Sequence, residues 1–198
     1  MYPFSILVNK KNPLTPHYIP SDLIEPDIPF YAPGNDPRRL LQREAAIAAE
    51  ELFERAQKEK IHLWGISGYR SYKRQEELFS SANGRSGVAP PGCSEHQTGL
   101  ALDISCPDEN YELEESFAKT KEGCWLAHHC ALFGFILRYP KNKEEITGFP
   151  FEPWHIRYTG IGLASSLTLT GMTLEEYYER ENELLSTTSS ILNVLIIL

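Results

Sequence analysis

The sequence predicts an α+β fold, and three observations lead to this class. Apolar residues recur at helical spacing through one early segment, from Leu41 to Ala56. Short β-type runs bounded by Gly, Pro or Asn follow this segment. Helical and strand-like segments then interleave irregularly along the chain. With 198 residues, of which 41% are hydrophobic, the chain is long enough to bury the core of a single domain.

Charge and cysteine content exclude several classes of protein. The formal net charge is −8 and no basic run occurs, which argues against a surface for nucleic acid or for anionic lipid. The cysteines form no CxxC pair, so we expect buried, small apolar residues rather than a zinc knot. They are Cys93, Cys106, Cys124 and Cys130. We therefore expect a soluble monomer with no nucleic-acid partner.

Residues 1–35 are rich in proline and turn-forming residues, which predicts an extended arm with little regular structure. The apolar patch Phe4–Val8 has no basic residues before it, unlike a secretory signal. Asp36 and Pro37 supply an N-cap and a first-turn proline, so a helix is expected to begin there and to end near Lys60. Its apolar face is formed by Leu41, Ala45, Ala48, Leu52 and Ala56.

The next part of the chain is expected to hold two strands and a helix between them. Ile61–Ser67 has the composition of a strand, and Gly68 ends it. Ser71 is placed to cap the helix, whose apolar face includes Leu78 and Phe79. Leu100–Ser105 is the second strand.

A third helix is expected from Leu113 or Ser116 to Phe133, with Gly134 as its C-cap. Two more strands are expected around a KNKEEITG turn. They are Phe135–Tyr139 and Phe151–Tyr158.

Near the C-terminus, Thr173 and Glu176 form a capping box that opens the last amphipathic helix. Ile191–Leu198 is apolar but much shorter than the roughly 20 residues that cross a bilayer. We therefore predict no transmembrane segment and assign no role to this tail. The predicted organisation is an arm at 1–35, a catalytic domain at 36–185 and a tail at 186–198.

The stretch GCSEHQTGLALDI, residues 92–104, contains two candidate metal ligands. Asp103 lies within an apolar strand, where a carboxylate is costly unless it is paired, hydrogen-bonded or bound to a metal. His96 precedes it by seven residues, so an unbroken strand would direct the two side chains to opposite faces. Gly99 between them allows the bend that would bring them together.

A second group, Glu152-Pro153-Trp154-His155, supplies a third candidate ligand and a candidate base. His155, with His96 and Asp103, completes a set of three protein ligands that leaves a fourth position open, as in catalytic zinc sites. Glu152 lies three residues before His155, where a base can stand near a metal without binding it. Spacing alone leaves a second interpretation open, in which His96 and Asp103 form a core salt link and His155 is unrelated.

Arg70 follows the predicted strand at 61–67 directly and is the remaining candidate. A guanidinium group suits a carboxylate or a developing oxyanion, although a surface salt bridge explains this position equally well. The other four histidines are interpreted as exposed or hydrogen-bonded side chains. They are His17, His62, His128 and His129.

Three segments resemble one known family. Residues 94–103, SEHQTGLALD, are similar to the SxHxxGxAxD zinc motif of the VanY-like D-alanyl-D-alanine carboxypeptidases. Residues 152–158, EPWHIRY, are similar to the second motif of these proteins, and residues 67–71, SGYRS, to their arginine motif. The order of the three segments also matches, and the resemblance extends broadly over residues 7–180.

The resemblance implies a small zinc peptidase fold with a central antiparallel sheet and flanking helices, shared with hedgehog signalling domains. Glu152 would be the general base on the zinc-bound water and later the proton donor to the leaving amine. Arg70 would stabilise the substrate carboxylate or the oxyanion. The implied Zn²⁺ ligands are His96, Asp103 and His155. The implied substrate-binding residues are Arg70, Ser94, Gln97 and Trp154.

The activity implied by the resemblance is cleavage of the terminal D-Ala-D-Ala bond of peptidoglycan stem peptides or their precursors. Related L,D-carboxypeptidases and D,D-dipeptidases share the metal motif, so both activities stay open. A non-catalytic zinc-containing binding module is a further alternative, against which Glu152 and Arg70 favour an enzyme. The resemblance implies the cell envelope as the compartment, while the lack of a signal segment leaves the cytoplasm open.

Overall fold

The computed structural model describes residues 4–83 and 88–197, and from residue 187 onward it describes the backbone only. At its centre lies a four-stranded antiparallel sheet with the strand order β3-β4-β6-β5. These strands are β3 (Trp64–Ser67), β4 (Ala101–Ser105), β6 (Glu152–Tyr158) and β5 (Phe135–Tyr139). All four were predicted close to these bounds, and the α+β class with a central antiparallel sheet is confirmed.

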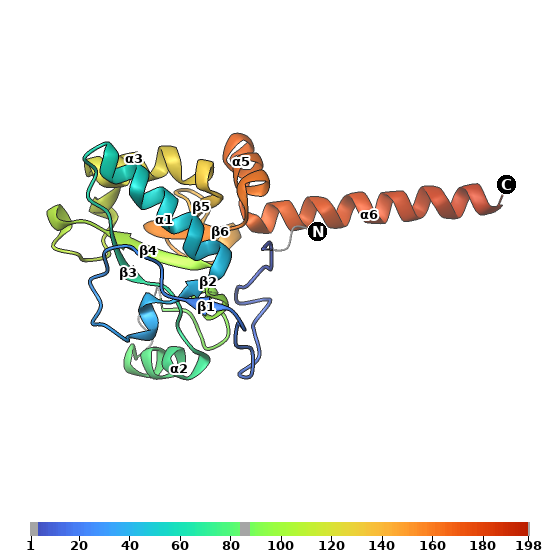
Figure 1. Cartoon of the computed structure of the whole chain (residues 1–198). Coiled ribbons are helices and arrows are strands. Elements are labelled where there is room, and N and C mark those ends of the chain that lie inside the picture. The colour runs from blue at the N-terminus through green and yellow to red at the C-terminus, as the bar shows by residue number, and fades with distance from the viewer. Residues whose placement is uncertain (1–3, 84–87, 198) are drawn as a thin grey trace.

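One face of this sheet carries the hydrophobic core. Leu102, Ile104 and Ile156 point to this face, are fully buried, and belong to one core cluster with Leu52 and Leu126. Leu52 comes from α1 (Arg43–Lys58) and Leu126 from α3 (Lys121–His129). Figure 1 shows these two helices on one side of the sheet and α2 on the other. Successive strand residues point to opposite faces, so Asp103 and His155 are presented on the face away from this core.

The first long helix begins later than the sequence predicted. Asp36 does act as a cap, but of a single 3₁₀ turn, Pro37–Arg39, in which its carboxylate accepts a hydrogen bond from the Arg38 backbone. The chain then forms β2 (Leu41–Gln42), which pairs with β1 (Leu23–Ile24) in the arm. Pairing with the arm therefore keeps these residues extended and delays the helix to Arg43.

Helix α2 (Tyr72–Ser81) begins as predicted, because the Ser71 hydroxyl accepts a hydrogen bond from the Arg74 backbone. Its predicted apolar face is partly wrong. Phe79 is 40% exposed, whereas the buried residue of this helix is Gln75. Leu78 is half-buried and borders the cavity described below.

The helix predicted to end at Phe133 is divided into three parts, although Gly134 does end the segment, with φ +83°. A 3₁₀ helix at Glu115–Lys119 and another at Cys130–Phe133 flank α3. The division arises because Thr120 caps α3 by accepting a hydrogen bond from the Gly123 backbone. Cys93, Cys106 and Cys130 are buried as expected, but Cys124 is exposed.

Two helices were not predicted from the sequence. One is α4 (Glu144–Thr147), within the predicted turn, and the other is α5 (Ile161–Thr170). The apolar residues of α5 are mixed with Ser and Thr on all sides of the helix, so its sequence shows no amphipathic pattern. Leu163 and Leu167 of α5 are nevertheless buried in a second, smaller core cluster.

The last helix, α6 (Leu174–Ile197), extends away from the domain (Figure 1). Its capping box is confirmed in both directions: the Thr173 backbone donates to Glu176 at 2.8 Å and the Glu176 backbone donates to Thr173 at 3.2 Å. The predicted boundary at 186 falls inside this helix, and the side chains of 187–198 lie outside the described residues. Among the helices that the structure describes, none has the length and apolar content needed to cross a membrane.

Candidate active site

The sheet itself brings two of the predicted ligands together. Asp103 of β4 and His155 of β6 are direct cross-strand partners in the antiparallel register. Side chains of such a pair project from the same face of the sheet. Oδ1 of Asp103 accordingly lies 3.0 Å from Nδ1 of His155, and both side chains are about 5% exposed.

The third predicted ligand reaches the same point from a turn before β4. His96 lies in a 3₁₀ helix, Glu95–Thr98, which ends at Gly99 in the left-handed conformation, with φ +69°. The predicted bend at Gly99 is therefore present. Nδ1 of His96 lies 2.7 Å from the carbonyl oxygen of Gly68, which can only accept, so the proton must be on Nδ1. Nε2 keeps its lone pair and lies 3.2 Å from Oδ2 of Asp103.

The geometry of this cluster fits a zinc ion. One ligand atom from each of His96, Asp103 and His155 lies within 4.8 Å of the others. Zinc bonds of about 2.0–2.1 Å at tetrahedral angles place neighbouring ligand atoms about 3.3 Å apart. The two imidazoles approach different oxygens of Asp103 at similar distances, Nε2 of His96 at 3.2 Å from Oδ2 and Nδ1 of His155 at 3.0 Å from Oδ1. Among the described residues, Oδ1 of Asp103 is buried without a well-formed hydrogen bond, although Nδ1 of His155 is so near. A shared cation accounts for that contact.

Burial and neighbouring charges have opposing effects on the pKa values of these three side chains. Burial lowers the pKa of His96, which favours its neutral, metal-binding form. Burial alone would raise the pKa of Asp103, but the two imidazoles outweigh it and hold that pKa well below its usual range. Burial would lower the pKa of His155, but the carboxylates of Asp103 and Glu95 beside its ring raise it to about 9. The metal-free pocket thus holds a proton on His155, which a bound cation would displace.

Glu152 stands beside the cluster without belonging to it. It is the first residue of β6, and its Oε2 lies 3.7 Å from Nδ1 of His155. Its side chain is 12% exposed, and this burial raises its pKa to about 7, partly offset by His155. A carboxylate with this pKa can accept a proton at neutral pH and return it.

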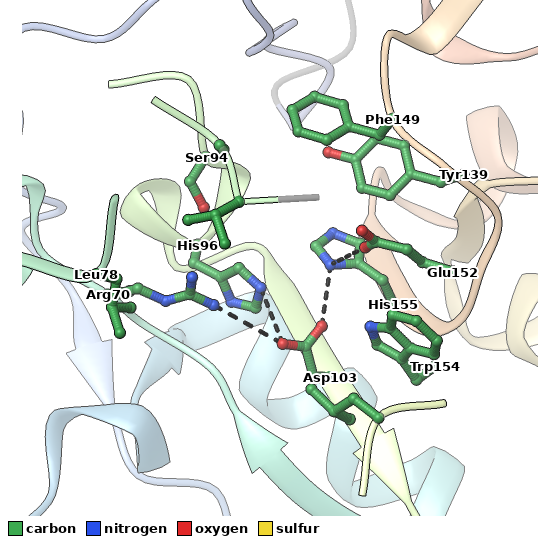
Figure 2. Close-up of a pocket in the computed structure, with 13 residues that line it drawn as sticks. Arg70, Leu78, Ser94, His96, Asp103, Tyr139, Phe149, Glu152, Trp154 and His155 are labelled. Atoms are coloured by element: carbon green, nitrogen blue, oxygen red, sulfur yellow. Dashed lines mark ion pairs between the residues drawn. The ribbon is translucent and has the colours of Figure 1, made fainter. Parts of the chain in front are cut away.

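Arg70 lies on the opposite side of Asp103 from His155, as Figure 2 shows. Its Nη2 is 3.8 Å from Oδ2 of Asp103, and its Nη1 donates to Oε1 of Gln75 at 2.9 Å. The Gln75 amide in turn donates to the Ala89 carbonyl at 2.6 Å. Burial lowers the pKa of Arg70. The guanidinium group is therefore held in place and partly desolvated, which strengthens its attraction for an anion.

These residues surround a cavity of about 250 Å³ (Figure 2). Ser94 and Trp154, two of the predicted substrate-binding residues, line it. Gln97 does not belong to its lining. Its amide donates instead to the carbonyls of Thr15 and Tyr18, at 2.9 and 3.1 Å, and so fixes the N-terminal arm. The other lining residues were not predicted and include Leu78, Val88, Ala89, Leu113, Tyr139 and Phe149.

Glu95 also lies at the site and was not predicted from the sequence. It is 1% exposed and lies directly before His96. Burial alone would raise its pKa, but the guanidinium groups of Arg138 and Arg157 outweigh that effect and hold the pKa far below its usual range. The available signal was a Glu directly before a predicted buried ligand, because a buried carboxylate requires partners.

Comparison with known proteins identifies the family. The family model for VanY, D-alanyl-D-alanine carboxypeptidase, matches residues 38–161, more than half of the chain. The chain belongs to the VanY family. The protein YodJ of Bacillus subtilis is 44% identical over 181 residues, which are 88% of this chain and 66% of YodJ. The chain thus spans slightly less than two thirds of that relative's length.

Two solved carboxypeptidase structures resemble this chain in fold and sequence. The LdcB LD-carboxypeptidase, described for its peptidoglycan recognition, has 44% identity and a TM-score of 0.84, covering 87% of this chain and 84% of its own. A mutant of the D,D-pentapeptidase VanY from a VanB-type cassette, in complex with Zn(II), has 32% identity and a TM-score of 0.70, covering 88% and 98%. The predicted fold family is confirmed, and zinc is the metal that fits the site.

Proposed function

We propose that this VanY-family chain is a zinc-dependent carboxypeptidase that removes the C-terminal D-alanine of peptidoglycan stem peptides or their precursors. One observation carries the proposal: a carboxylate with a pKa of about 7, Glu152, adjoins a three-ligand cluster inside a cavity that also presents Arg70. A structural metal site needs neither an adjacent base nor a cavity. This pairing favours an enzyme over the alternative of a non-catalytic binding module.

The metal would be held by Nε2 of His96, by the Asp103 carboxylate and by Nδ1 of His155. When bound, zinc supplies a Lewis acid that lowers the pKa of a coordinated water toward about 7 and polarises a carbonyl group. Asp103 supplies the only negative charge among these three ligands, so the site keeps a net positive charge that attracts the carbonyl oxygen.

Glu152 is the proposed general base. Its carboxylate takes a proton from the attacking water and then delivers it to the nitrogen of the departing D-alanine, which leaves as a free amine. Burial raises the pKa of Glu152 in the metal-free pocket, which favours its holding a proton between the two transfers. Its 3.7 Å distance from Nδ1 of His155 keeps it beside the metal ligands.

Arg70 is the proposed anchor for the substrate carboxylate or the oxyanion. A carboxypeptidase must recognise a free C-terminal carboxylate, and a guanidinium group can bind both of its oxygens. Gln75 occupies Nη1 of Arg70, and the weak 3.8 Å contact between Nη2 and Asp103 leaves that edge of the fork open to a ligand. Ser94 and Trp154 are proposed to contact the same end of the peptide.

The exact bond has two candidates. The sequence motifs and the name of the family model favour the D-Ala-D-Ala bond at the end of a pentapeptide stem. A tetrapeptide stem, whose terminal D-alanine follows an L-centre, is the second candidate. It is favoured by the greater similarity to the LdcB LD-carboxypeptidase, at 44% identity against 32% for the VanY structure.

One experiment tests both the zinc-dependent carboxypeptidase activity and the identity of the bond that is cleaved. The zinc-loaded protein is incubated with a pentapeptide stem, a tetrapeptide stem and the free D-Ala-D-Ala dipeptide, each with and without a chelator, and D-alanine release is measured. Release that the chelator abolishes is expected from at least one stem, and the preferred peptide identifies the bond. Preference for the dipeptide would indicate a dipeptidase. A protein with stoichiometric zinc that releases no D-alanine from any of them would instead support a binding module.

A further inference from the structure

A buried carboxylate lies directly behind the metal cluster. Oε1 of Glu95 accepts hydrogen bonds from Nε of Arg138 and from Nη1 of Arg157, both at 2.7 Å. Oε2 faces the ring of His155, 3.6 Å from Nε2. The catalytic proposal uses only the opposite side of that ring, where Nδ1 meets Asp103 and Glu152.

The two facing atoms have no other hydrogen-bond partner within the described part of the chain. Both Oε2 of Glu95 and Nε2 of His155 are buried and unsatisfied. At 3.6 Å the two atoms lie just outside the usual range of a direct hydrogen bond. Because buried polar groups are nearly always satisfied, each atom is the natural partner of the other.

We propose that Glu95 is a positioning residue that keeps the proton of His155 on Nε2, so that Nδ1 presents its lone pair to the metal. A neutral imidazole carries a single N–H, and the hydrogen bond at one nitrogen decides which nitrogen can bind a metal. Without an acceptor at Nε2, the proton of His155 would be stabilised at Nδ1 by Asp103, 3.0 Å away. The metal position would then be blocked by a proton.

The surroundings of Glu95 are built to keep it charged and immobile. Arg138 also binds both carboxylate oxygens of Glu175, at 2.8 and 2.7 Å. The remaining Nη2 of Arg157 donates to the backbone carbonyls of Phe4 and Ile6, at 3.1 and 2.9 Å. Two carboxylates and two guanidinium groups thus balance in formal charge. Oε1 is fully engaged by the arginines, which leaves Oε2 free for His155.

This network also links the site to both ends of the described chain. Glu175 lies in the first turn of α6 and accepts a hydrogen bond from the Asn9 side chain at 3.0 Å. The Phe4 and Ile6 carbonyls come from the N-terminal arm. The arm and α6 therefore complete the shell that positions Glu95, although neither contributes a metal ligand.

The test compares two substitutions in the same network, Glu95→Gln and Glu175→Gln. Each removes one negative charge beside Arg138, but only Glu95 faces His155. In Glu95→Gln the two arginines need the amide oxygen, which turns the NH₂ group toward Nε2 and favours the wrong tautomer. Zinc affinity, measured by competition with a chelator, is expected to fall about 10–100-fold in Glu95→Gln and to stay near wild type in Glu175→Gln.

Equal losses of zinc affinity in the two variants would reduce Glu95 to a charge-balancing role and overturn the proposal, as would no loss in Glu95→Gln. If Glu95→Gln does not fold, long-range ¹H–¹⁵N spectra of the zinc-loaded wild type decide the question. A proton on Nε2 of His155 is expected, and a metal-bound Nε2 would overturn the assignment. The inference rests on the metal site of the proposed function but not on its substrate. Zinc binding therefore tests it even if no stem peptide is cleaved.

Discussion

Asp103 and His155 face each other across two adjacent antiparallel strands, with Oδ1 and Nδ1 3.0 Å apart. The next strand continues the same row, because Ser67 of β3 pairs with Asp103. Arg70 follows Ser67 after two residues. One cross-section of the sheet therefore fixes two proposed ligands and the start of the segment that carries the proposed anchor. A rigid sheet is suited to this task, because metal and substrate geometry tolerate little movement.

Glu152→Gln should separate catalysis from metal binding. The amide keeps the size of the carboxylate but cannot accept and return a proton. We expect kcat for D-alanine release to fall by about 100–10,000-fold, the usual contribution of a general base. Zinc content, measured by atomic absorption, should stay at one ion per chain, because Glu152 is not among the three clustered ligands.

His96→Ala serves as the comparison for Glu152→Gln, because removal of a proposed ligand should abolish zinc binding itself. His128→Ala is the matched control, because His128 is exposed on α3 and its Nδ1 lies 2.6 Å from the Cys124 carbonyl, away from the metal cluster. Near wild-type turnover in Glu152→Gln would contradict the role of Glu152 as general base. Full zinc occupancy in His96→Ala would contradict the role of His96 as a metal ligand.

Activity should fall on the acidic side of neutrality. Glu152 acts only when ionised, and its pKa is raised from 4.5 to about 7 in the metal-free pocket. A nearby bound cation favours the carboxylate and lowers that pKa again. The acid limb of kcat/KM is therefore expected between pH 4.5 and 7, with a tenfold loss per pH unit below the apparent pKa. A kcat/KM profile at saturating zinc measures it, and the limb should disappear in Glu152→Gln.

Much of this site was visible in the sequence because local signals and chemistry agreed. Asp103 interrupts an apolar strand, Gly99 allows the left-handed bend before it, and the structure brings His96 and His155 to the same carboxylate. The caps at Ser71 and Thr173 were equally local, since each depends on a residue three positions further along. Signals of this kind need no knowledge of the rest of the fold.

The missing parts depend on contacts between distant segments. Leu41 continues a helical apolar pattern, yet pairing with Ile24 holds it in a strand. Gln75 interrupts the apolar face of α2, and its burial is explained by its hydrogen bonds to Arg70 and Ala89. Glu95 needs arginines far along the chain to be tolerated in the interior. Binary patterns cannot reveal such partners, because they describe one segment at a time.

Arg70→Lys should weaken substrate recognition although the charge is kept. A lysine ammonium cannot bind Gln75 and a substrate carboxylate in the planar geometry that a guanidinium offers. Loss of a charged hydrogen bond costs about 1.5–3 kcal/mol, which corresponds to a decrease of about 10–100-fold in kcat/KM for the preferred stem peptide. Arg74→Lys is the control, since Arg74 is exposed and pairs with Glu77 on the surface of α2. Equal effects of the two substitutions would contradict a role for Arg70 in binding.

Gly99→Ala should destabilise the fold and weaken zinc binding together, because one residue both turns the chain and contacts the arm. A Cβ at Gly99 would lie 2.7 Å from Cδ2 of Leu23 and 3.1 Å from the backbone nitrogen of Gln42. Gly171→Ala isolates the backbone effect, since Gly171 has a similar φ of +66° but no atom within 4 Å of the added carbon. The left-handed conformation should cost about 1–2 kcal/mol in both variants, measured as the free energy of unfolding in urea.

The clash with the arm should add about 1–3 kcal/mol in Gly99→Ala alone. The Leu23 side chain can rotate away from the added carbon, but the Gln42 nitrogen at 3.1 Å belongs to the backbone, so the turn that carries His96 has to shift by a few tenths of an ångström. That shift moves Nε2 of His96 from its place 3.2 Å from Asp103. Zinc affinity should therefore fall in Gly99→Ala and stay unchanged in Gly171→Ala. If both variants bound zinc as the wild type does, the bend at Gly99 would matter for stability but not for aiming the ligand.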